Sequence, residues 1–122
     1  MCPTKISWSR SIVCLLTAIA LCPPCCVGRY REALAVQCDK GKIHDCLALG
    51  YMLVRGQDGH EDPARALEYF VRSCELGNSI GCKKAGEIWK SGAIGFKNLQ
   101  KAEMYFRMAQ ELTAQELDGT RR

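Results

Sequence analysis

The chain repeats itself with a period of 36 residues, and this feature constrains its fold most. The residues that coincide after a shift of 36 are mostly cysteines, glycines and aromatic residues. The matching pairs are Cys38/Cys74, Cys46/Cys82, Gly41/Gly77, Gly50/Gly86, Gly56/Gly92, Gly59/Gly95, Ala66/Ala102, Tyr69/Tyr105 and Phe70/Phe106. Such a period is typical of repeat architectures, in which each unit buries its apolar face only against its neighbours.

The repeated unit has the apolar spacing of a helix. Ala66, Tyr69, Phe70, Ser73 and Cys74 stand at positions that share one helix face. The same spacing recurs one period later, and short glycine-rich segments separate the apolar runs. We therefore predict antiparallel pairs of helices.

Capping residues mark where these helices begin and end. Asp62 followed by Pro63 predicts a helix start, because aspartate caps free amides and proline fits the first turn. Asn98 takes the capping position in the next copy. Gly56 and Gly77 stand where a left-handed residue ends a helix.

These signals predict an all-α fold with helices at residues 29–40, 43–55, 62–76, 79–91 and 98–115. The first helix is the second half of an incomplete repeat, so we expect a short α-solenoid of about two and a half repeats. Gly50 and Gly86 fall inside predicted helices, where glycine costs about 1 kcal/mol relative to alanine. We expect a neighbouring helix to approach closely there, with Tyr69 and Phe70 filling the space.

The first 28 residues have the features of an export leader. Lys5 and Arg10 precede an apolar run from Ile12 to Cys22. This run is shorter than the roughly 20 apolar residues that span a bilayer, but it fits the central part of a signal peptide. We therefore expect a periplasmic or secreted protein. Lipid anchoring, a retained membrane anchor and a misassigned start codon before a cytosolic protein stay as alternatives.

Small residues offer two cleavage positions, after Ala20 and after Gly28. The predicted organisation is therefore a leader at 1–28, helical repeats at 29–115 and a frayed tail at 116–122. The net charge is +4 for the whole chain, and the charges are interspersed. Without a basic stripe, nucleic acid and membrane surfaces are disfavoured as partners.

The repeat resembles the Sel-one-like repeat, a relative of the tetratricopeptide repeat. The resemblance is carried by the stretch ALEYFVRSCELGNSIGCKKAGEIWKSGAIGF and covers residues 29–112. The matching signals are Leu49-Gly50, the G-x-x-G pairs Gly56/Gly59 and Gly92/Gly95, Arg65-Ala66 and Lys101-Ala102. The second copy departs from this pattern with Ala85 before Gly86.

The cysteine pair in CELGNSIGC is similar to the signature of a cysteine-rich bacterial subgroup, the helicobacter-cysteine-rich-protein-like proteins. That subgroup is secreted or periplasmic, and it has a relative in the mitochondrial intermembrane space. Its functions differ from member to member. The resemblance therefore implies fold and compartment more firmly than activity.

Four of the nine cysteines lie outside the leader, namely Cys38, Cys46, Cys74 and Cys82. In the predicted register Cys74 ends one helix and Cys82 lies in the first turns of the next, which brings them within reach of a disulfide. The same geometry applies to Cys38 and Cys46, and the subgroup resemblance implies the same pairing. Each bridge closes a short loop worth about 2–3 kcal/mol.

Zinc binding and nucleophilic catalysis are the competing interpretations of these cysteines. Structural zinc prefers cysteines two to four residues apart, whereas each pair here has seven residues between. His44 lies near Cys46, but its equivalent one period later is Ile80. We interpret His44 and His60 as loop residues that face solvent, and we expect no metal and no cofactor.

The leading functional hypothesis is an exported scaffold that binds a protein or peptide. The first helices of repeat pairs usually line the concave side of a solenoid. The candidate partner-binding residues are Tyr51 in 43–55 and Lys83, Glu87 and Lys90 in 79–91. Packing of Leu47, Tyr51 and Val54 inside the protein is the alternative. Because two and a half repeats are near the minimum for a stable array, a homodimer through an open end is a further expectation.

The family resemblance also implies an alternative function, a penicillin-binding protein with weak β-lactamase activity. Serine β-lactamases carry S-x-x-K, S-D-N and K-T-G motifs, and none of these occurs here. No catalytic residue can therefore be named, and the sequence leaves open whether the protein is an enzyme. A cell-wall fragment or a β-lactam could also bind without turnover.

Overall fold

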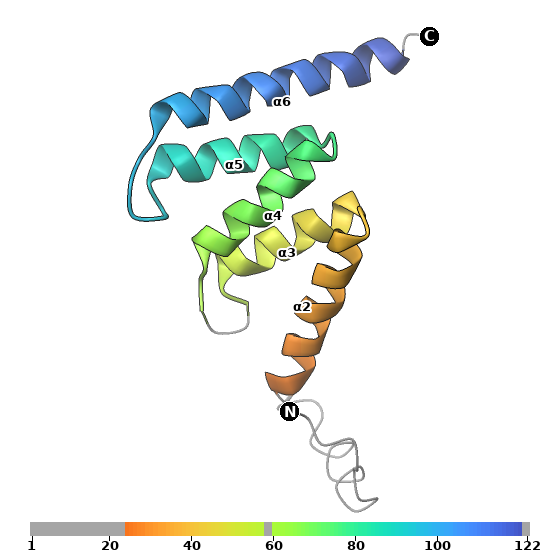
Figure 1. Cartoon of the computed structure of the whole chain (residues 1–122), viewed down its shortest axis with the longest axis vertical. Helices are drawn as coiled ribbons and strands as arrows, with labels where there is room; N and C mark the ends of the chain where they lie inside the picture. Colours follow the sequence, from red (N-terminus) through yellow and green to blue (C-terminus); the bar gives the residue numbers. More distant parts are fainter. Residues whose placement is uncertain (1–23, 58–59, 121–122) are drawn as a thin grey trace, which may run out of the picture.

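The computed structural model describes residues 24–57 and 60–120. These residues form only helices, namely α2 (Pro24–Asp39), α3 (Ile43–Arg55), α4 (Pro63–Glu75), α5 (Ser79–Ser91) and α6 (Leu99–Thr120). The predicted all-α class is therefore confirmed for the described part of the chain (Figure 1). None of these helices combines the length and the apolar character that crossing a membrane requires.

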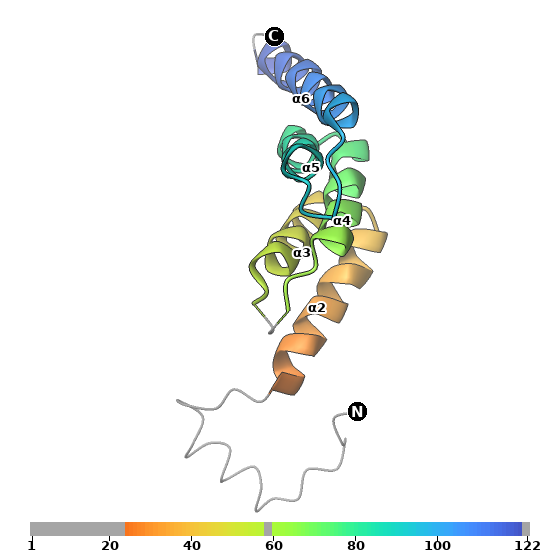
Figure 2. The same ribbon diagram turned by 90° about the vertical axis from the view of Figure 1, so that its left-hand side faces the viewer.

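Each helix packs chiefly against the helices next to it in the chain. Figure 1 shows the helices following one another from α2 at one end to α6 at the other. Seen from the side, α3 and α5 lie in one row, while α2, α4 and the start of α6 lie in the other (Figure 2). The described residues thus have a helical repeat architecture in which neighbouring units are joined in series.

The predicted bounds of α3 and α5 match the structure, and the other helices differ at their ends. Helix α4 begins at Pro63 because Asp62 is its cap and lies outside the helical turn. Helix α2 begins earlier than predicted, at Pro24, since proline is favoured at a first helical position. Residues 24–28 of the predicted leader therefore form the first turns of α2, and residues 1–23 lie outside the described residues.

Helix α6 continues to Thr120, past the predicted end at residue 115. The residues after 112 lost the apolar period, which suggested a frayed end. Gln115, Glu116 and Leu117 nevertheless have good intrinsic helix propensity, so the helix continues without a packing partner on every side.

The predicted caps form in both copies of the repeat. The Asp62 carboxylate accepts a hydrogen bond from the amide of Arg65 at 3.0 Å. The Asn98 side chain accepts one from the amide of Lys101, also at 3.0 Å. Gly77 has a φ of +94° at the end of α4, a backbone conformation that other residues rarely adopt.

The loops that follow α3 and α5 are tied down by equivalent backbone hydrogen bonds. The amide of Asp62 donates to the carbonyl of Leu53 at 2.9 Å, and the amide of Asn98 donates to the carbonyl of Trp89 at 3.0 Å. Both donors and both acceptors are related by the shift of 36. The sequence repeat is therefore also a repeat of specific contacts.

Helix glycines give the paired helices of each unit their close approach. A Cβ atom at Gly50 would lie 2.6 Å from Cε1 of Phe70, and one at Gly86 would lie 2.8 Å from Cε1 of Phe106. Phe70 is only 1% exposed, so its ring has little room to move aside. The expected close approach at these glycines is confirmed, and the phenylalanines fill the space.

The main core runs along the array between the two rows of helices. Its buried residues come from all five described helices, namely Leu34, Leu49, Leu53, Ala66, Leu67, Phe70, Ala85, Ile88, Trp89 and Ala102. A second, smaller cluster joins Cys74 and Cys82 to Ala109 of α6. The core is thus continuous along the array rather than gathered at one centre.

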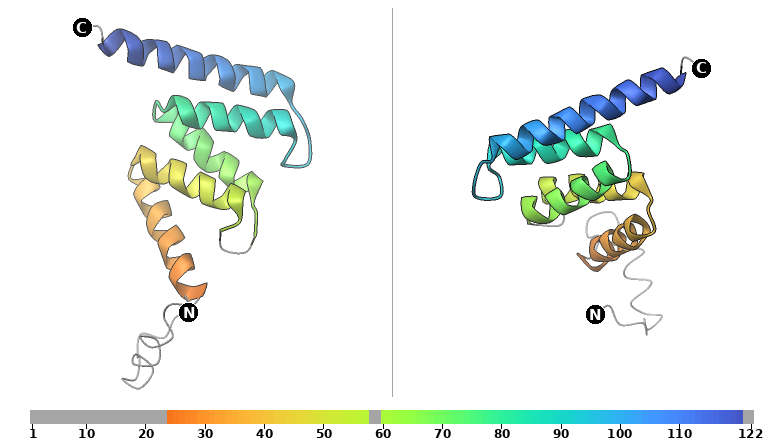
Figure 3. Two further views of the ribbon diagram at one scale, coloured as in Figure 1. Left: turned by 180° about the vertical axis from the view of Figure 1, so that it is seen from behind. Right: turned by 45° about the horizontal axis from the view of Figure 1, so that its top comes forward.

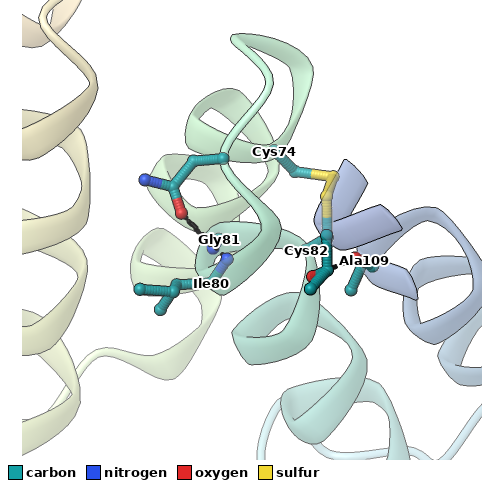
Figure 4. Close-up of a disulfide and its surroundings, with 7 residues drawn as sticks. Cys74, Ile80, Gly81, Cys82 and Ala109 are labelled. Carbon is teal, nitrogen blue, oxygen red and sulfur yellow. Dashed lines mark hydrogen bonds between the residues drawn. A yellow bond between two sulfur atoms is a disulfide. The ribbon is translucent and has the colours of Figure 1, made fainter. Parts of the chain in front are cut away.

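Two disulfides link the units, as the sequence predicted. Cys38 is bonded to Cys46 and Cys74 to Cys82, with Cα atoms 4.7 and 4.5 Å apart. Figure 4 shows the Cys74–Cys82 bridge between the end of α4 and the start of α5, with Ala109 beside it. All four cysteines are at most 2% exposed. Each bridge therefore ties the second helix of one unit to the first helix of the next.

The close approach at the helix glycines predicts a stability effect. Gly86→Ala should destabilise the protein by about 1–3 kcal/mol, because the added methyl group overlaps the ring of Phe106. Urea unfolding followed by circular dichroism measures the change. Gly119→Ala is the matched control, since nothing lies within 4 Å of its Cβ position in α6. Equal stability for Gly86→Ala and the parent would contradict the packing role.

The second disulfide should contribute measurably to stability. Replacing Cys74 and Cys82 together by alanine should lower the free energy of unfolding by about 2.5 kcal/mol or more, because the bridge closes a loop of sequence separation 8. In the parent protein, iodoacetamide should modify these cysteines only after unfolding and reduction. A parent protein whose Cys74 and Cys82 are alkylated while folded would show that the bridge is absent.

Candidate functional site

The α3–α5 face, formed by the outward sides of α3 and α5, holds the predicted residues Tyr51 and Glu87. These two residues are equivalent in the repeat, and Lys84 lies between them. Its Nζ atom is 5.8 Å from the centre of the Tyr51 ring and 2.6 Å from Oε2 of Glu87. Lys84 therefore links the first helices of two successive units.

Tyr51 is held in place from below and from the side. Its ring meets that of Phe70 edge to face, with centroids 5.4 Å apart and planes at 77°. The guanidinium carbon of Arg55 lies 5.8 Å from the same ring. A half-buried aromatic ring fixed by core packing and bordered by cations is a preorganised anchor for a partner.

The ion pair between Lys84 and Glu87 raises the pKa of Lys84. The largest cause is the hydrogen bond to the Glu87 carboxylate, which outweighs the opposing effect of partial burial. The charges of Glu87 and Tyr51 add to the rise. The two side chains remain 32% and 43% exposed, so the pair contributes little to folding. Its main effect is to position charge on the α3–α5 face.

The other two predicted partner-binding residues lie apart from this arrangement. Lys83 is exposed and lines a hollow between α5 and α6. Lys90 is exposed in the last turn of α5. Of the apolar equivalents, Leu47 packs against the core and Val54 is 39% exposed. The structure thus brings Tyr51 and Glu87 together and does not group them with Lys83 or Lys90.

Lys84 was missed because the sequence argument considered equivalent positions one by one. Two signals could have found it. Lys84 precedes Glu87 by three residues on a helix, a spacing that forms ion pairs. Its equivalent in α3 is Ala48, and α5 lies alongside α3 in the same row (Figure 2). A long cation at that position can reach the neighbouring unit.

The histidines and cysteines form no alternative site in the described ranges. No group of three or more histidine, cysteine, aspartate or glutamate residues in 24–57 and 60–120 could hold a metal ion. His60 is an exposed loop residue, as predicted. His44 is also exposed, but it lies in the first turn of α3 rather than in a loop, because the helix already begins at Ile43.

A small hollow of about 250 Å³ opens between α2, α3 and α4 beside Leu53 and Arg65. The equivalents of these residues one period later are Trp89 and Lys101, and Lys101 Nζ lies 4.4 Å from the centre of the Trp89 ring. The smaller Leu53 leaves space that the indole occupies in the second copy. The hollow therefore follows from one departure from the repeat.

Comparisons with known proteins give partial similarities only. No family model matches the chain, and no solved structure matches it. Chitin synthase regulatory factor 1 of Schizosaccharomyces pombe is 38% identical over 71 residues, which cover 57% of this chain and 16% of that protein. Cytochrome c oxidase assembly factor 7 of Xenopus tropicalis is 29% identical over 93 residues, covering 75% and 40%.

A third similar protein is cytochrome c oxidase assembly factor 7A of Xenopus laevis, 29% identical over 91 residues that cover 74% of this chain and 39% of that protein. The chain spans less than half the length of each of these three relatives. The likeness therefore concerns a part of each relative.

The ion pair on the α3–α5 face predicts a pH effect. Glu87→Gln should lower the pKa of Lys84 toward the ordinary lysine value, because the hydrogen-bonded carboxylate is lost. The raised pKa means that the pair contributes below the pKa of an unfolded lysine, about 10.4, and that its contribution is lost as the pH rises through the folded value. Parent and variant should therefore converge in stability at alkaline pH.

A side-chain NMR titration of Lys84 measures this shift, with unfolding curves recorded beside it. Below pH 10 the free energy of unfolding should differ by less than about 1 kcal/mol. An unchanged Lys84 titration in Glu87→Gln would show that the pair does not form in solution.

Proposed function

We infer that this chain is an exported scaffold of the Sel-one-like type, a short disulfide-stabilised α-solenoid that binds a protein or peptide. The bridge from Tyr51 through Lys84 to Glu87 is the observation that carries the proposal. It joins two successive units into one continuous surface. Such a surface suits an extended ligand that runs across the repeats.

Recurring contacts support the solenoid part of the proposal. The Gly50–Phe70 contact is repeated as Gly86–Phe106, and the cap of Asp62 is repeated as that of Asn98. A chain in which each unit repeats the same contacts to its neighbours grows in one direction. This behaviour fits a Sel-one-like array that follows a leader.

Two observations support work in an oxidising compartment after export. Both disulfides are buried, and disulfides persist mainly in secreted, periplasmic and intermembrane locations. The basic start and short apolar run of residues 1–28 fit a signal peptide. A periplasmic or secreted location accounts for both.

The residue types on the α3–α5 face support binding of a protein or peptide. Tyrosine and arginine are the residues on which binding energy often concentrates, and Tyr51 and Arg55 lie together here. Val54 adds an exposed apolar side chain, while Lys84 and Glu87 supply both signs of charge. A peptide with an apolar anchor flanked by charged residues matches this mixture.

The names of the relatives agree with such a role. One relative is named a regulatory factor of chitin synthase and two are named assembly factors of cytochrome c oxidase. Regulation and assembly proceed through contact with other proteins. β-Lactam hydrolysis stays the competing hypothesis from the family resemblance, and turnover of a chromogenic cephalosporin tests it.

Peptide selection tests the scaffold proposal. Peptides selected from a random display library against the oxidised protein should bind at least tenfold more weakly to Tyr51→Ala, because the aromatic anchor is lost. Glu87→Arg should weaken the same peptides, because it reverses a charge on the α3–α5 face. Fluorescence anisotropy with synthetic peptides measures both.

Glu68→Arg on α4 is the matched control, since Glu68 is exposed and makes the same change of charge elsewhere. It should bind the peptides as the parent does. Peptides that bind all three variants equally would place binding outside the α3–α5 face. Cephalosporin turnover that co-purifies with the folded protein would favour the enzyme instead.

A further inference from the structure

Helix α6 is much longer than the helix against which it packs. It has 22 residues and α5 has 13, so the helices are about 33 and 20 Å long. Both views in Figure 3 show α6 running past the first turn of α5. The second half of α6 is therefore only partly covered by the rest of the described chain.

A hollow of about 660 Å³ lies where the start of α5 meets this second half of α6. Phe106 and Ala109 form part of its floor, and Ile80 and Leu117 stand at its sides with 48% and 64% exposure. Lys83 of α5 also lines it. The hollow is thus a mainly apolar groove with one cation, and we call it the end groove.

The repeat itself shows what such a groove holds. A shift of 36 moves Ala109 onto Ser73 of α4. There the first turn of α5 sits so close that a Cβ atom at Gly81 would lie 2.8 Å from Cβ of Ser73. One period earlier the equivalent surface is therefore covered by a helix. After α6 no further helix follows in the described residues to cover the end groove.

Terminal units of a repeat array need a polar outer face to stay soluble. The outer face of the last unit instead exposes Ile80 and Leu117 beside the end groove. The helix that best fits the groove is the second half of α6 from another copy. It presents Leu117 to the apolar floor, and its Asp118 is an acid for Lys83.

We propose that two copies of this chain form a two-fold dimer in which the second half of each α6 lies in the end groove of the other. In such a dimer the same surface patch serves both partners. When Thr113 lies near the axis of the antiparallel pair, Leu117 of one copy faces Ala109 of the other, since each is one turn from the axis. Asp118 then approaches Lys83 of the other copy.

The same alignment avoids contacts between like charges along α6. Glu111 faces Gln115 of the other copy, and Glu116 faces Gln110. Carboxylates opposite amides can accept hydrogen bonds, whereas carboxylates opposite each other would repel. The sequence of α6 is thus compatible with pairing to itself in this register.

This dimer is independent of the α3–α5 face, so it can be tested without a ligand. Sedimentation of the full oxidised chain should show a reversible monomer–dimer equilibrium. Free thiols are alkylated first, so that leader cysteines cannot cross-link the copies. Leu117→Glu should weaken the dimer by about 100-fold, because two leucines leave the interface and each contributes about tenfold or more.

Leu99→Glu is the matched control, because Leu99 is 62% exposed at the opposite end of the same helix. It should dimerise as the parent does, and circular dichroism should show that both variants are folded. A parent that stays monomeric at every concentration overturns the proposal. Equal weakening by Leu99→Glu and Leu117→Glu overturns it too.

A charge exchange tests the register of the dimer. Lys83→Asp and Asp118→Lys should each weaken dimerisation, and the double variant should recover it because the opposite charges meet again. If the double variant is weaker than either single variant, the alignment about Thr113 is wrong. A strictly monomeric chain whose end groove binds an added helical peptide would assign the groove to a different partner and exclude the second copy.

Discussion

The contact between a helix glycine and a phenylalanine ring determines how the units of this chain are built. At Gly50 and Gly86 the absence of a side chain lets the following helix approach until its ring lies on the backbone. The cost of glycine in a helix, about 1 kcal/mol, is offset by burial of Phe70 and Phe106. Because the contact recurs after 36 residues, both units have the same internal geometry, and the loops and caps recur with it.

The disulfides act between the units rather than within them. A chain of this size buries too little apolar surface to be very stable without added constraints. Cys74–Cys82 joins α4 to α5 across the boundary between units, and Ala109 of α6 packs against it. The glycine contacts therefore define each unit, and the bridges fix each unit to the next.

Local features could be predicted from the sequence, and features that depend on several helices could not. Capping by Asp62 and pairing of Cys74 with Cys82 depend on residues close in the chain, and both were found. The bridge made by Lys84 depends on how two units stack, which the repeat pattern does not encode. Likewise, Lys83 lies at the end groove rather than beside Glu87, because its environment is set by where α6 runs.

Both disulfides join cysteines that are only eight positions apart. Four cysteines allow three pairings, and closing a short loop costs less chain entropy than closing a long one. Once the leader is removed, the native partner of Cys38 is the nearest cysteine in the chain, and the same is true of Cys82. A chain that emerges from a membrane channel N-terminus first therefore presents each correct pair before the next pair arrives. Oxidation can follow translocation unit by unit, and the native pairing is also the one that forms fastest.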